Sequence, residues 1–333
     1  MSDTTEAPTP LRPLKTWSHL TSQRRRPSEY EIVSTNLLWH TRESESIWEV
    51  SGPQSFMTEW YARYRDGSPV QHEDWDRFRD PDELVYRTYN ILQDGQETYV
   101  DGLLEQYAGE EHDANLSDAW VTTLAQLYTP GRYLLHTVQM ASSYLVHIPP
   151  ASTIGNCAAF QAADAFRWVS RTAYRTKELS NTHPSAGFGD NDRRMWEELP
   201  AWQGFRELME KALVAYDWAE AFLALNVVAK PSIDEAWLRQ LAVSARRSDD
   251  TLLGLLADAA LRDSERSRRW TAALVEMMLL GNQEILQDWL SRWVPLGEAA
   301  VTAFCAELPE NPEAADTAVE RMRAFRTQLG FKE

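Results

Sequence analysis

Cysteines and long apolar runs are scarce in this sequence, and each scarcity excludes a class of protein. The 333 residues include two cysteines, Cys157 and Cys305, which excludes a disulfide framework and fits a reducing compartment. The longest nearly apolar stretch, residues 221–229, is far shorter than the roughly 20 residues that a bilayer span needs. The N-terminus carries Asp3 and Glu6 and lacks the apolar segment of a signal peptide. We therefore expect a soluble, cytoplasmic protein.

Positive charge is also in short supply. Thirty-three basic residues stand against 50 acidic residues, which gives a net charge of −17 at pH 7. Such a balance does not offer the basic footprint that a duplex nucleic acid or an anionic membrane surface requires. What is present, 43% hydrophobic and 25% charged residues, is the ordinary composition of a globular protein. We therefore expect a folded chain that binds neither nucleic acid nor membrane.

The first 50 residues differ from the rest and predict an extended N-terminal arm. Pro8, Pro10 and Pro13 disfavour an early helix, and residues 30–33 favour a β conformation. The aromatic residues of this arm follow no helical period, so they must pack on the body of the chain or on another subunit. We expect the arm, residues 1–50, to pack on a partner subunit. The candidate contact residues are Trp17, Arg24, Arg25, Arg26, Tyr30, Trp39 and Trp48.

From residue 51 onward the pattern is helical and predicts a single helical domain, residues 51–333. Apolar residues recur at intervals of three and four, and almost nothing alternates as a strand would. Asp80 and Pro81 predict a helix start, while Gly95 and Gly102 inside that helix suggest close approach of a neighbouring helix. The expected helices span residues 54–65, 80–106, 116–148 with a break at Pro130, 152–180, 202–229 ended by Pro231, 232–246, 249–263, 264–280, 282–307 and 311–329. Long helices joined by short loops predict an all-α bundle.

The motif that builds carboxylate-bridged metal sites in helical bundles, Glu-x-x-His, is missing. None of the seven histidines has an acidic residue three positions before it. The nearest approximation is Asp217 with Glu220, but the apolar Leu223 stands where the imidazole would be. Because unpaired buried carboxylates are costly, this pair is expected to bind arginines of the 152–180 helix.

Other catalytic signatures are missing as well. Gly187-Phe188-Gly189 lacks the third glycine of a dinucleotide-binding loop, and the sequence contains no phosphate-binding loop or nucleophile elbow. Cys157 lies among small residues and is expected to be a buried spacer, because a reactive thiol needs a cationic, exposed environment. The residues by themselves therefore predict no catalytic, cofactor-binding or metal-binding residue in this chain.

Several stretches of the sequence carry more than composition. They are residues 15–20, 26–34, 80–90, 93–97, 151–157, 172–176, 202–204 and 206–211. Together these stretches resemble the β subunit of the hydroxylase component of bacterial toluene/alkene-type multicomponent diiron monooxygenases, in the same order over roughly residues 15–300. The β subunits of phenol hydroxylase and soluble methane monooxygenase are similar at a greater distance.

The resemblance implies a ferritin-like helical bundle from which the diiron ligands are absent. It implies assembly with an α subunit and a γ subunit, as a dimer of αβγ protomers, with the diiron centre in α. It also implies an O2- and NADH-dependent complex that receives electrons through a reductase and a Rieske ferredoxin and is tuned by a small effector protein. The expected reactions are hydroxylation of aromatics such as toluene or epoxidation of alkenes such as isoprene.

Three hypotheses follow for this chain. The first is a non-catalytic structural β subunit, which the resemblance favours. The second is an enzyme with its own metal, which the survey of histidines disfavours. The third is a stand-alone helical interaction protein without an oxygenase partner, and a neighbouring gene that encodes an α subunit with two Glu-x-x-His motifs would separate it from the first.

Overall fold

The computed structural model describes residues 26–35, 37 and 56–332. Over these residues the chain folds into helices and contains no strand, so the all-α prediction is confirmed. Five candidate contact residues of the arm lie outside the described residues: Trp17, Arg24, Arg25, Trp39 and Trp48. No described helix combines the length and the hydrophobicity that crossing a lipid bilayer takes.

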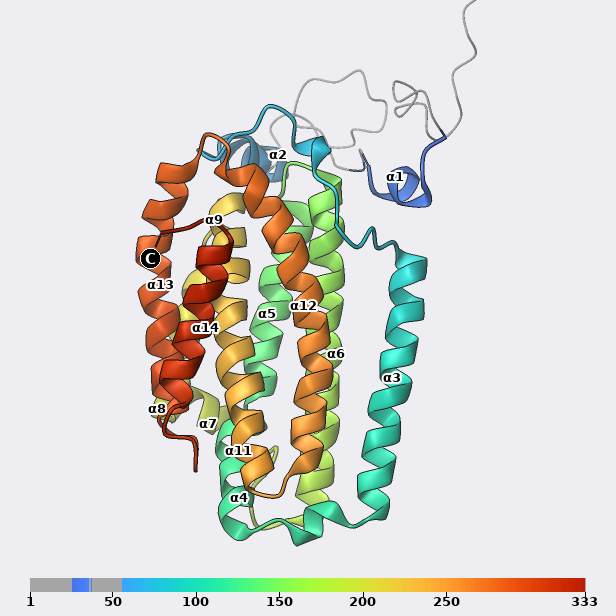
Figure 1. Cartoon of the computed structure of the whole chain (residues 1–333), viewed down its shortest axis with the longest axis vertical. Helices are drawn as coiled ribbons and strands as arrows, with labels where there is room; N and C mark the ends of the chain where they lie inside the picture. Colours follow the sequence, from blue (N-terminus) through green and yellow to red (C-terminus); the bar gives the residue numbers. More distant parts are fainter. Residues whose placement is uncertain (1–25, 36, 38–55, 333) are drawn as a thin grey trace, which may run out of the picture.

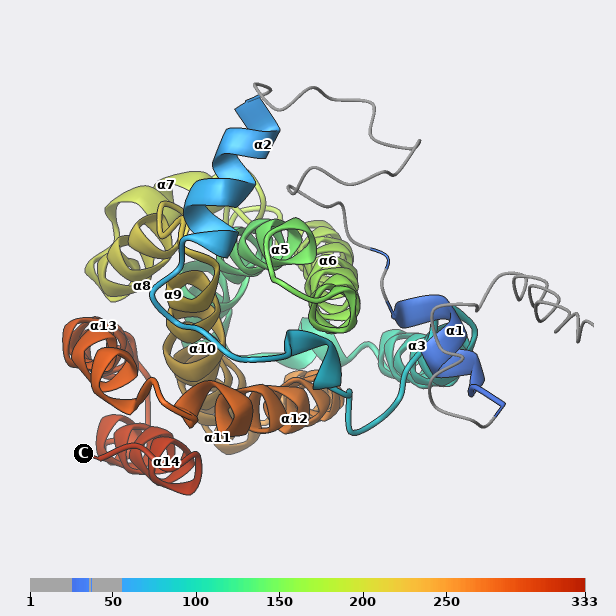
Figure 2. The same ribbon diagram turned by 90° about the horizontal axis from the view of Figure 1, so that it is seen from above.

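Four long helical elements form the centre of the molecule (Figures 1 and 2). Three of them are α5 (Gly131–His147), α6 (Ser152–Thr182) and α12 (Thr251–Leu279). The fourth, which we call the central rod, runs through residues 218–247 without leaving the helical conformation. It joins α9 (Trp218–Phe222), a π-helical segment (Leu223–Ala229), α10 (Lys230–Ile233), a second π-helical segment (Asp234–Gln240) and α11 (Leu241–Arg247).

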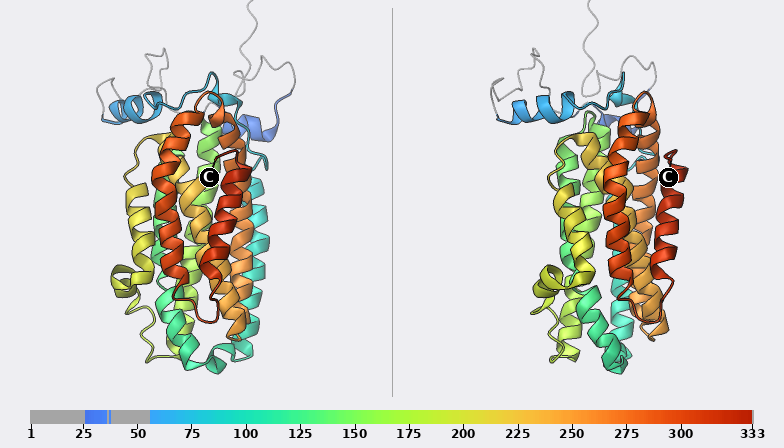
Figure 3. Two further views of the ribbon diagram at one scale, coloured as in Figure 1. Left: turned by 60° about the vertical axis from the view of Figure 1, so that its left-hand side comes forward. Right: turned by 90° about the vertical axis from the view of Figure 1, so that its left-hand side faces the viewer.

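Further helices surround this centre. Helix α3 (Tyr86–Gly109) stands at the outer edge beside α12, as Figures 1 and 2 show, and α13 (Gln283–Cys305) packs along α8 (Pro200–Ala212). Helix α14 (Ala314–Gln328) lies on α13 and the central rod, next to the C-terminus (Figure 3). Short elements complete the described part: α1 (Glu29–Ser34), α2 (Phe56–Tyr61), α4 (Asp118–Thr123), α7 (Asp192–Glu198), 3-10 turns at Trp75–Arg77 and His112–Asn115, and π-helical turns at Ala62–Asp66 and Leu124–Tyr128.

Several of the expected helices have nearly the predicted bounds, among them α13 (expected 282–307) and α14 (expected 311–329). Helix α6 begins at Ser152 and continues to Thr182, close to the expected 152–180. The break expected at Pro130 is also present, because α5 begins immediately after it at Gly131. Proline lacks a backbone N–H and is therefore tolerated at the start of a helix.

The helix expected at 202–229 begins close to its predicted start, at Pro200, but it is interrupted after Ala212 and its predicted end is wrong. Helix α8 ends at Ala212, and α9 begins at Trp218, where the Asp217 carboxylate accepts hydrogen bonds from the N–H groups of Ala219 (2.9 Å) and Glu220 (3.2 Å). Pro231 does not end the rod either. It lies in α10 between the two π-helical segments, where the hydrogen-bond register already changes and a missing N–H is accommodated.

Two further expectations at the helix level are corrected. Residues 249–263 and 264–280 form one helix, α12, because the polar residues around position 264 point into the bundle instead of marking a loop. Asp80 does not start a helix: its carboxylate accepts hydrogen bonds from the N–H groups of Asp82 (3.0 Å) and Leu84 (3.2 Å), which forms a turn, and α3 begins at Tyr86. Helix α1, in contrast, does begin with a capping motif, because Ser28 and Glu31 form a reciprocal capping box.

The expected close approach at the α3 glycines is wrong within this chain. A Cβ atom placed on Gly95 or Gly102 would meet no described atom within 4 Å, and both residues lie on the exposed side of α3. The close approach occurs at Gly204 of α8, where a Cβ would lie 2.5 Å from the Cα atom of Ala300 on α13.

Candidate functional site

A closed network of neutral polar side chains joins the four central helical elements. Gln161 of α6 donates from Nε2 to Ser142 Oγ of α5 (3.0 Å) and to Asn226 Oδ1 of the central rod (3.1 Å). Asn226 donates in return to Gln161 Oε1 (3.0 Å) and to Thr271 Oγ1 of α12 (3.0 Å), and Ser267 donates to the same Gln161 oxygen (2.6 Å). All five side chains are buried, so these hydrogen bonds tie the four elements together in the interior.

Helical bundles of this kind build carboxylate-bridged diiron sites from side chains that project inward from four helices. In this chain the inward side chains of the neutral network are amides and hydroxyls that use their hydrogen-bonding groups on one another. A diiron centre needs bridging carboxylates and imidazoles, so this set of donors does not fit one. Within the described ranges no three His, Cys, Asp or Glu side chains are grouped so that they could hold a metal ion.

A charged cluster lies beside the neutral network, between α3, α6 and α12. Arg266 of α12 donates to the carboxylates of Asp164 on α6 and Asp263 on α12. Asp164 also accepts hydrogen bonds from Tyr89 Oη and Gln93 Nε2 of α3, both at 2.8 Å. A guanidinium therefore supplies the positive charge that two buried carboxylates need.

The second carboxylate of this cluster is held by α6. Asp263 accepts hydrogen bonds from Trp168 Nε1 (2.9 Å) and Arg167 Nη1 (3.1 Å). Burial and the neighbouring Asp263 carboxylate raise the pKa of Asp164 to about 6, while Arg266 and Tyr89 act in the opposite direction. The cluster holds its charges in place but exposes no reactive group, because each carboxylate oxygen faces a donor on a packed helix.

The arginines of α6 were expected to bind Asp217 and Glu220, and this is wrong. Arg167 and Arg171 bind Glu97 of α3, and Arg171 also reaches Asp101 on the same helix. Arg175 is buried and binds Asp113 in the turn that follows α3. The ion pairs of α6 therefore fix the outer helix α3 to the bundle.

Asp217 and Glu220 have other partners. Asp217 caps α9 and accepts a hydrogen bond from Ser68 Oγ (3.0 Å), and burial raises its pKa above the usual value. Glu220 accepts a hydrogen bond from Trp293 Nε1 (3.0 Å) and lies 3.5 Å from the Arg292 guanidinium. Asp217 is thus a helix cap, a role that its spacing from Glu220 did not predict, because it directly precedes the first turn of α9.

The two cysteines are buried, as expected for Cys157. Burial and the nearby Asp80 raise the pKa of the Cys157 thiol well above its ordinary value, and burial raises the pKa of Cys305 to about 12. Both thiols thus lie in environments that disfavour the thiolate, the opposite of the cationic, exposed setting of a reactive cysteine.

Two of the candidate contact residues of the arm lie within the described part. Tyr30 belongs to α1 rather than to a β segment, and it is 4% exposed because its ring packs within this chain and its hydroxyl accepts a hydrogen bond from the N–H of Asp80 (3.0 Å). The structure thus places Tyr30 in the chain's own interior, which corrects its expected position on a partner. Arg26 lies exposed, just before α1.

Sequence reasoning missed the neutral network, although one signal for it was present. Asn226 is the single polar residue in the apolar run 221–229, and a lone amide in such a run must find partners inside the bundle. Gln161, Ser142 and Ser267 carry no comparable signal, because polar residues at their spacing also occur on solvated helix faces.

Comparisons with known proteins agree with this architecture. The family model described as methane/phenol/alkene hydroxylase matches residues 60–281. The chain is 49% identical over 299 residues to the β subunit of the hydroxylase component of the toluene-4-monooxygenase system from Ectopseudomonas mendocina, which covers 89% of this chain and 91% of that protein. It is 22% identical to the small subunit of the propane 2-monooxygenase hydroxylase component from Gordonia sp. (strain TY-5), over 73% of this chain and 66% of that protein.

Solved structures of hydroxylase chains share the fold of this protein. A chain of toluene 4-monooxygenase, solved with toluene bound in its resting active site, superposes with a TM-score of 0.84 at 48% identity and covers 91% of this chain and 99% of that chain. A chain of phenol hydroxylase from Pseudomonas sp. OX1 shares the fold, with a TM-score of 0.83 at 18% identity and coverage of 100% and 99%. The expected ferritin-like helical fold is thereby confirmed. The chain belongs to the methane/phenol/alkene hydroxylase family and is a subunit of the hydroxylase component of a multicomponent monooxygenase.

Proposed function

We propose that this chain is the non-catalytic, structural β subunit of its hydroxylase and supports an α subunit that carries the diiron centre. One observation carries the proposal: the neutral network occupies the inward positions of the four central elements with amides and hydroxyls. These groups satisfy one another and offer no bridging carboxylate to a metal. This chain then contributes shape and rigidity, and no catalytic, cofactor-binding or metal-binding residue.

The proposal includes the rest of the complex. The chain would assemble with α and γ subunits as a dimer of αβγ protomers in the cytoplasm. An effector protein, a Rieske ferredoxin and an NADH-dependent reductase would act with it, and the complex would hydroxylate aromatics such as toluene or epoxidise alkenes such as isoprene. The high identity to a toluene-4-monooxygenase β subunit favours an aromatic substrate.

The packing of this chain is suited to a supporting role. A diiron site needs surroundings that keep its geometry while the substrate enters and leaves. Here the neutral network fixes the four central elements, and the ion pairs of α6 with Glu97 and Asp101 fix α3 beside them. Permanent subunit interfaces are large and apolar, and α3 and α6 present large apolar side chains to solvent: Tyr86, Ile91, Leu92, Tyr99, Phe166 and Tyr174.

Iron analysis after co-expression tests the proposal. The chain is produced with and without the candidate α subunit, each species is purified, and its iron is measured per polypeptide. We expect stoichiometric iron and hydrocarbon oxidation only in species that contain α, because this chain lacks a suitable donor set.

The contradicting results are equally clear. Stoichiometric iron in the chain purified alone would show that it holds its own metal. Failure to associate with α under any condition would favour a stand-alone interaction protein. An Asn226→Leu variant serves as a structural control, since it disrupts the neutral network without adding or removing a metal-type ligand.

A further inference from the structure

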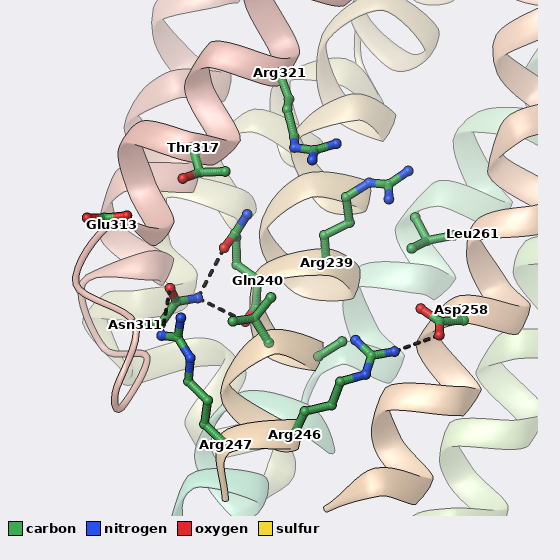
Figure 4. Close-up of a pocket in the computed structure, with 12 residues that line it drawn as sticks. Arg239, Gln240, Arg246, Arg247, Asp258, Leu261, Asn311, Glu313, Thr317 and Arg321 are labelled. Carbon is green, nitrogen blue, oxygen red and sulfur yellow. Dashed lines mark hydrogen bonds and ion pairs between the residues drawn. The ribbon is translucent and has the colours of Figure 1, made fainter.

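Arginines converge on a pocket far from the neutral network. The pocket has a volume of about 300 Å³ and lies where the central rod, α12 and α14 meet. Four guanidinium groups line it: Arg239 of the rod, Arg246 and Arg247 of α11, and Arg321 of α14 (Figure 4). This concentration of positive charge stands out in a chain whose net charge is −17.

Fewer carboxylates than arginines line this pocket, because Asp258 and Glu313 stand against four guanidinium groups. Behind the wall, Glu235 is 1% exposed, and its carboxylate lies within 4.0 Å of three guanidinium groups: Arg268 at 2.8 Å, Arg239 at 3.3 Å and Arg321 at 4.0 Å. The buried Glu235 carboxylate thus lies near three cations, of which Arg268 also pairs with Asp234 at 3.4 Å. Two of these, Arg239 and Arg321, also face the pocket, so part of their charge is left to a further anion.

The remaining two arginines differ in their partners. Arg246 forms an ion pair with Asp258 at 2.6 Å. Arg247 donates to the backbone carbonyl of Glu310 and to the side-chain amide of Asn311, both of which are uncharged acceptors. Arg247 lines the pocket, and the two hydrogen bonds that hold its guanidinium go to uncharged oxygens and not to a carboxylate.

We propose that this pocket binds a compact anion with two or more negative charges, such as phosphate or a small dicarboxylate. Planar guanidinium groups bind phosphate and carboxylate oxygens in a bidentate geometry, and several of them are needed to remove such an anion from water. Thr317 adds a hydroxyl, and Leu261 provides an apolar wall for a short carbon chain. Because these arginines come from the central rod, which includes α11, and from α14, a bound anion contacts both the bundle and the C-terminal helix. This inference does not depend on the structural role proposed above.

Anion titration of the assembled hydroxylase tests the inference. Phosphate, succinate, formate and chloride are added at constant ionic strength, and binding is followed by isothermal titration calorimetry and by the midpoint of thermal unfolding. We expect saturable binding of phosphate or succinate with a Kd of about 1 mM or tighter, and a higher midpoint, while formate and chloride have no saturable effect.

Variants locate the binding. Arg239→Gln with Arg321→Gln is expected to weaken binding at least about tenfold, because two charge-assisted contacts are lost. Arg321→Lys keeps the charge and is expected to fall between the wild type and the double variant. Arg323→Gln is the matched control: it removes the same charge from α14, but Arg323 binds Glu298 and does not line the pocket, so affinity should stay within about twofold.

The outcomes are distinct. Saturation by phosphate alone or by succinate alone each supports the pocket and identifies its ligand class. Responses that are equal for all anions at one ionic strength, or a double variant that binds as tightly as the wild type, overturn it. Circular dichroism of the variants checks that a lost response reflects lost contacts and not lost structure.

Discussion

Asp250 is completely buried, yet its carboxyl stays ionised more readily than in water. Burial by itself raises the pKa of this group, but His112, the charge of Arg175, Trp120 and the N–H of Leu253 together lower it below the usual 3.8. Trp120 Nε1 and the Leu253 N–H donate at 2.9 Å each, and His112 Nε2 lies 3.2 Å away. One side chain therefore caps α12 and ties it to α4 and to the turn after α3.

Replacing this carboxylate tests its structural role. Asp250→Ala is expected to lower the free energy of unfolding by about 2–4 kcal/mol, from a lost helix cap and an unpaired buried indole N–H. Urea unfolding of the purified chain at pH 7 measures it. Asp288→Ala removes an exposed carboxylate, 71% accessible, and should change stability by no more than about 0.5 kcal/mol. Equal effects at both positions would show that Asp250 has no special role.

The same group predicts how stability depends on pH. Its folded-state pKa lies below its unfolded value of 3.8, so the stability it gives is present above about pH 4 and is lost as the pH falls toward the folded value. Asp250→Asn cannot titrate. The difference in unfolding free energy between wild type and this variant is therefore expected to be constant above about pH 5 and to shrink as the pH falls below about 4, as measured by urea unfolding. A difference that is constant with pH would contradict the lowered pKa.

At the scale of elements, the contact between α8 and α13 depends on a glycine. A Cβ on Gly204 would lie 2.5 Å from the Ala300 Cα atom and would force the two helix backbones apart. The glycines of α3 are different, because the space beside Gly95 is open in this chain. Gly204 and Gly95 both lie inside helices, but only at Gly204 does the packing require the absence of a side chain.

Alanine at these two glycines should change stability in opposite directions. Gly204→Ala is expected to destabilise the chain by about 1–3 kcal/mol through overpacking. Gly95→Ala is expected to stabilise it by about 0.5–1 kcal/mol, because alanine loses less backbone entropy in a helix. The two urea midpoints are compared in the same buffer. A stabilising Gly204→Ala would mean that α8 and α13 can separate freely, against the contact described here.

At the scale of the whole molecule, the described part of the N-terminal segment belongs to the body of the chain. Besides the Tyr30 contact with Asp80, Glu31 forms an ion pair with Arg79 at 2.9 Å. Ser152 Oγ of α6 donates to the Ser34 carbonyl at 2.6 Å. A deletion that reaches through α1 therefore removes internal packing as well as the arm, and a shorter one is needed to test the arm by itself.

Two truncations separate these effects. Deleting residues 1–25 is expected to reduce co-purification with α while leaving the thermal midpoint of the chain unchanged, since α1 is retained. Deleting residues 1–45 should lower the midpoint as well, because the α1 contacts with Asp80, Arg79 and Ser152 are lost. Full yield and activity of the complex formed with the shorter truncation would contradict the expected packing of residues 1–25, with Trp17, Arg24 and Arg25, on a partner.

Periodicity was enough to predict that α6 spans residues near 152–180 and that Pro130 interrupts a helix, because both features depend on local spacing and on a missing N–H. It failed at Pro231 and around residue 264. There the chain stays helical because buried partners from other helices stabilise it, and such partners are not encoded in local spacing. The family resemblance supplied the ferritin-like form of the bundle and the assignment to a hydroxylase component, which the residues alone did not.

The sequence by itself determined the helical class, the absence of Glu-x-x-His and the family, since these depend on local pattern and on matching stretches of residues. Only the tertiary structure decided that Gln161 meets Asn226, that Arg266 lies between Asp164 and Asp263, and that four arginines converge on one pocket. The reason is physical: Gln161 and Asn226 are 65 positions apart and Arg266 and Asp164 are 102 apart, so these contacts exist only once packing brings different helices together.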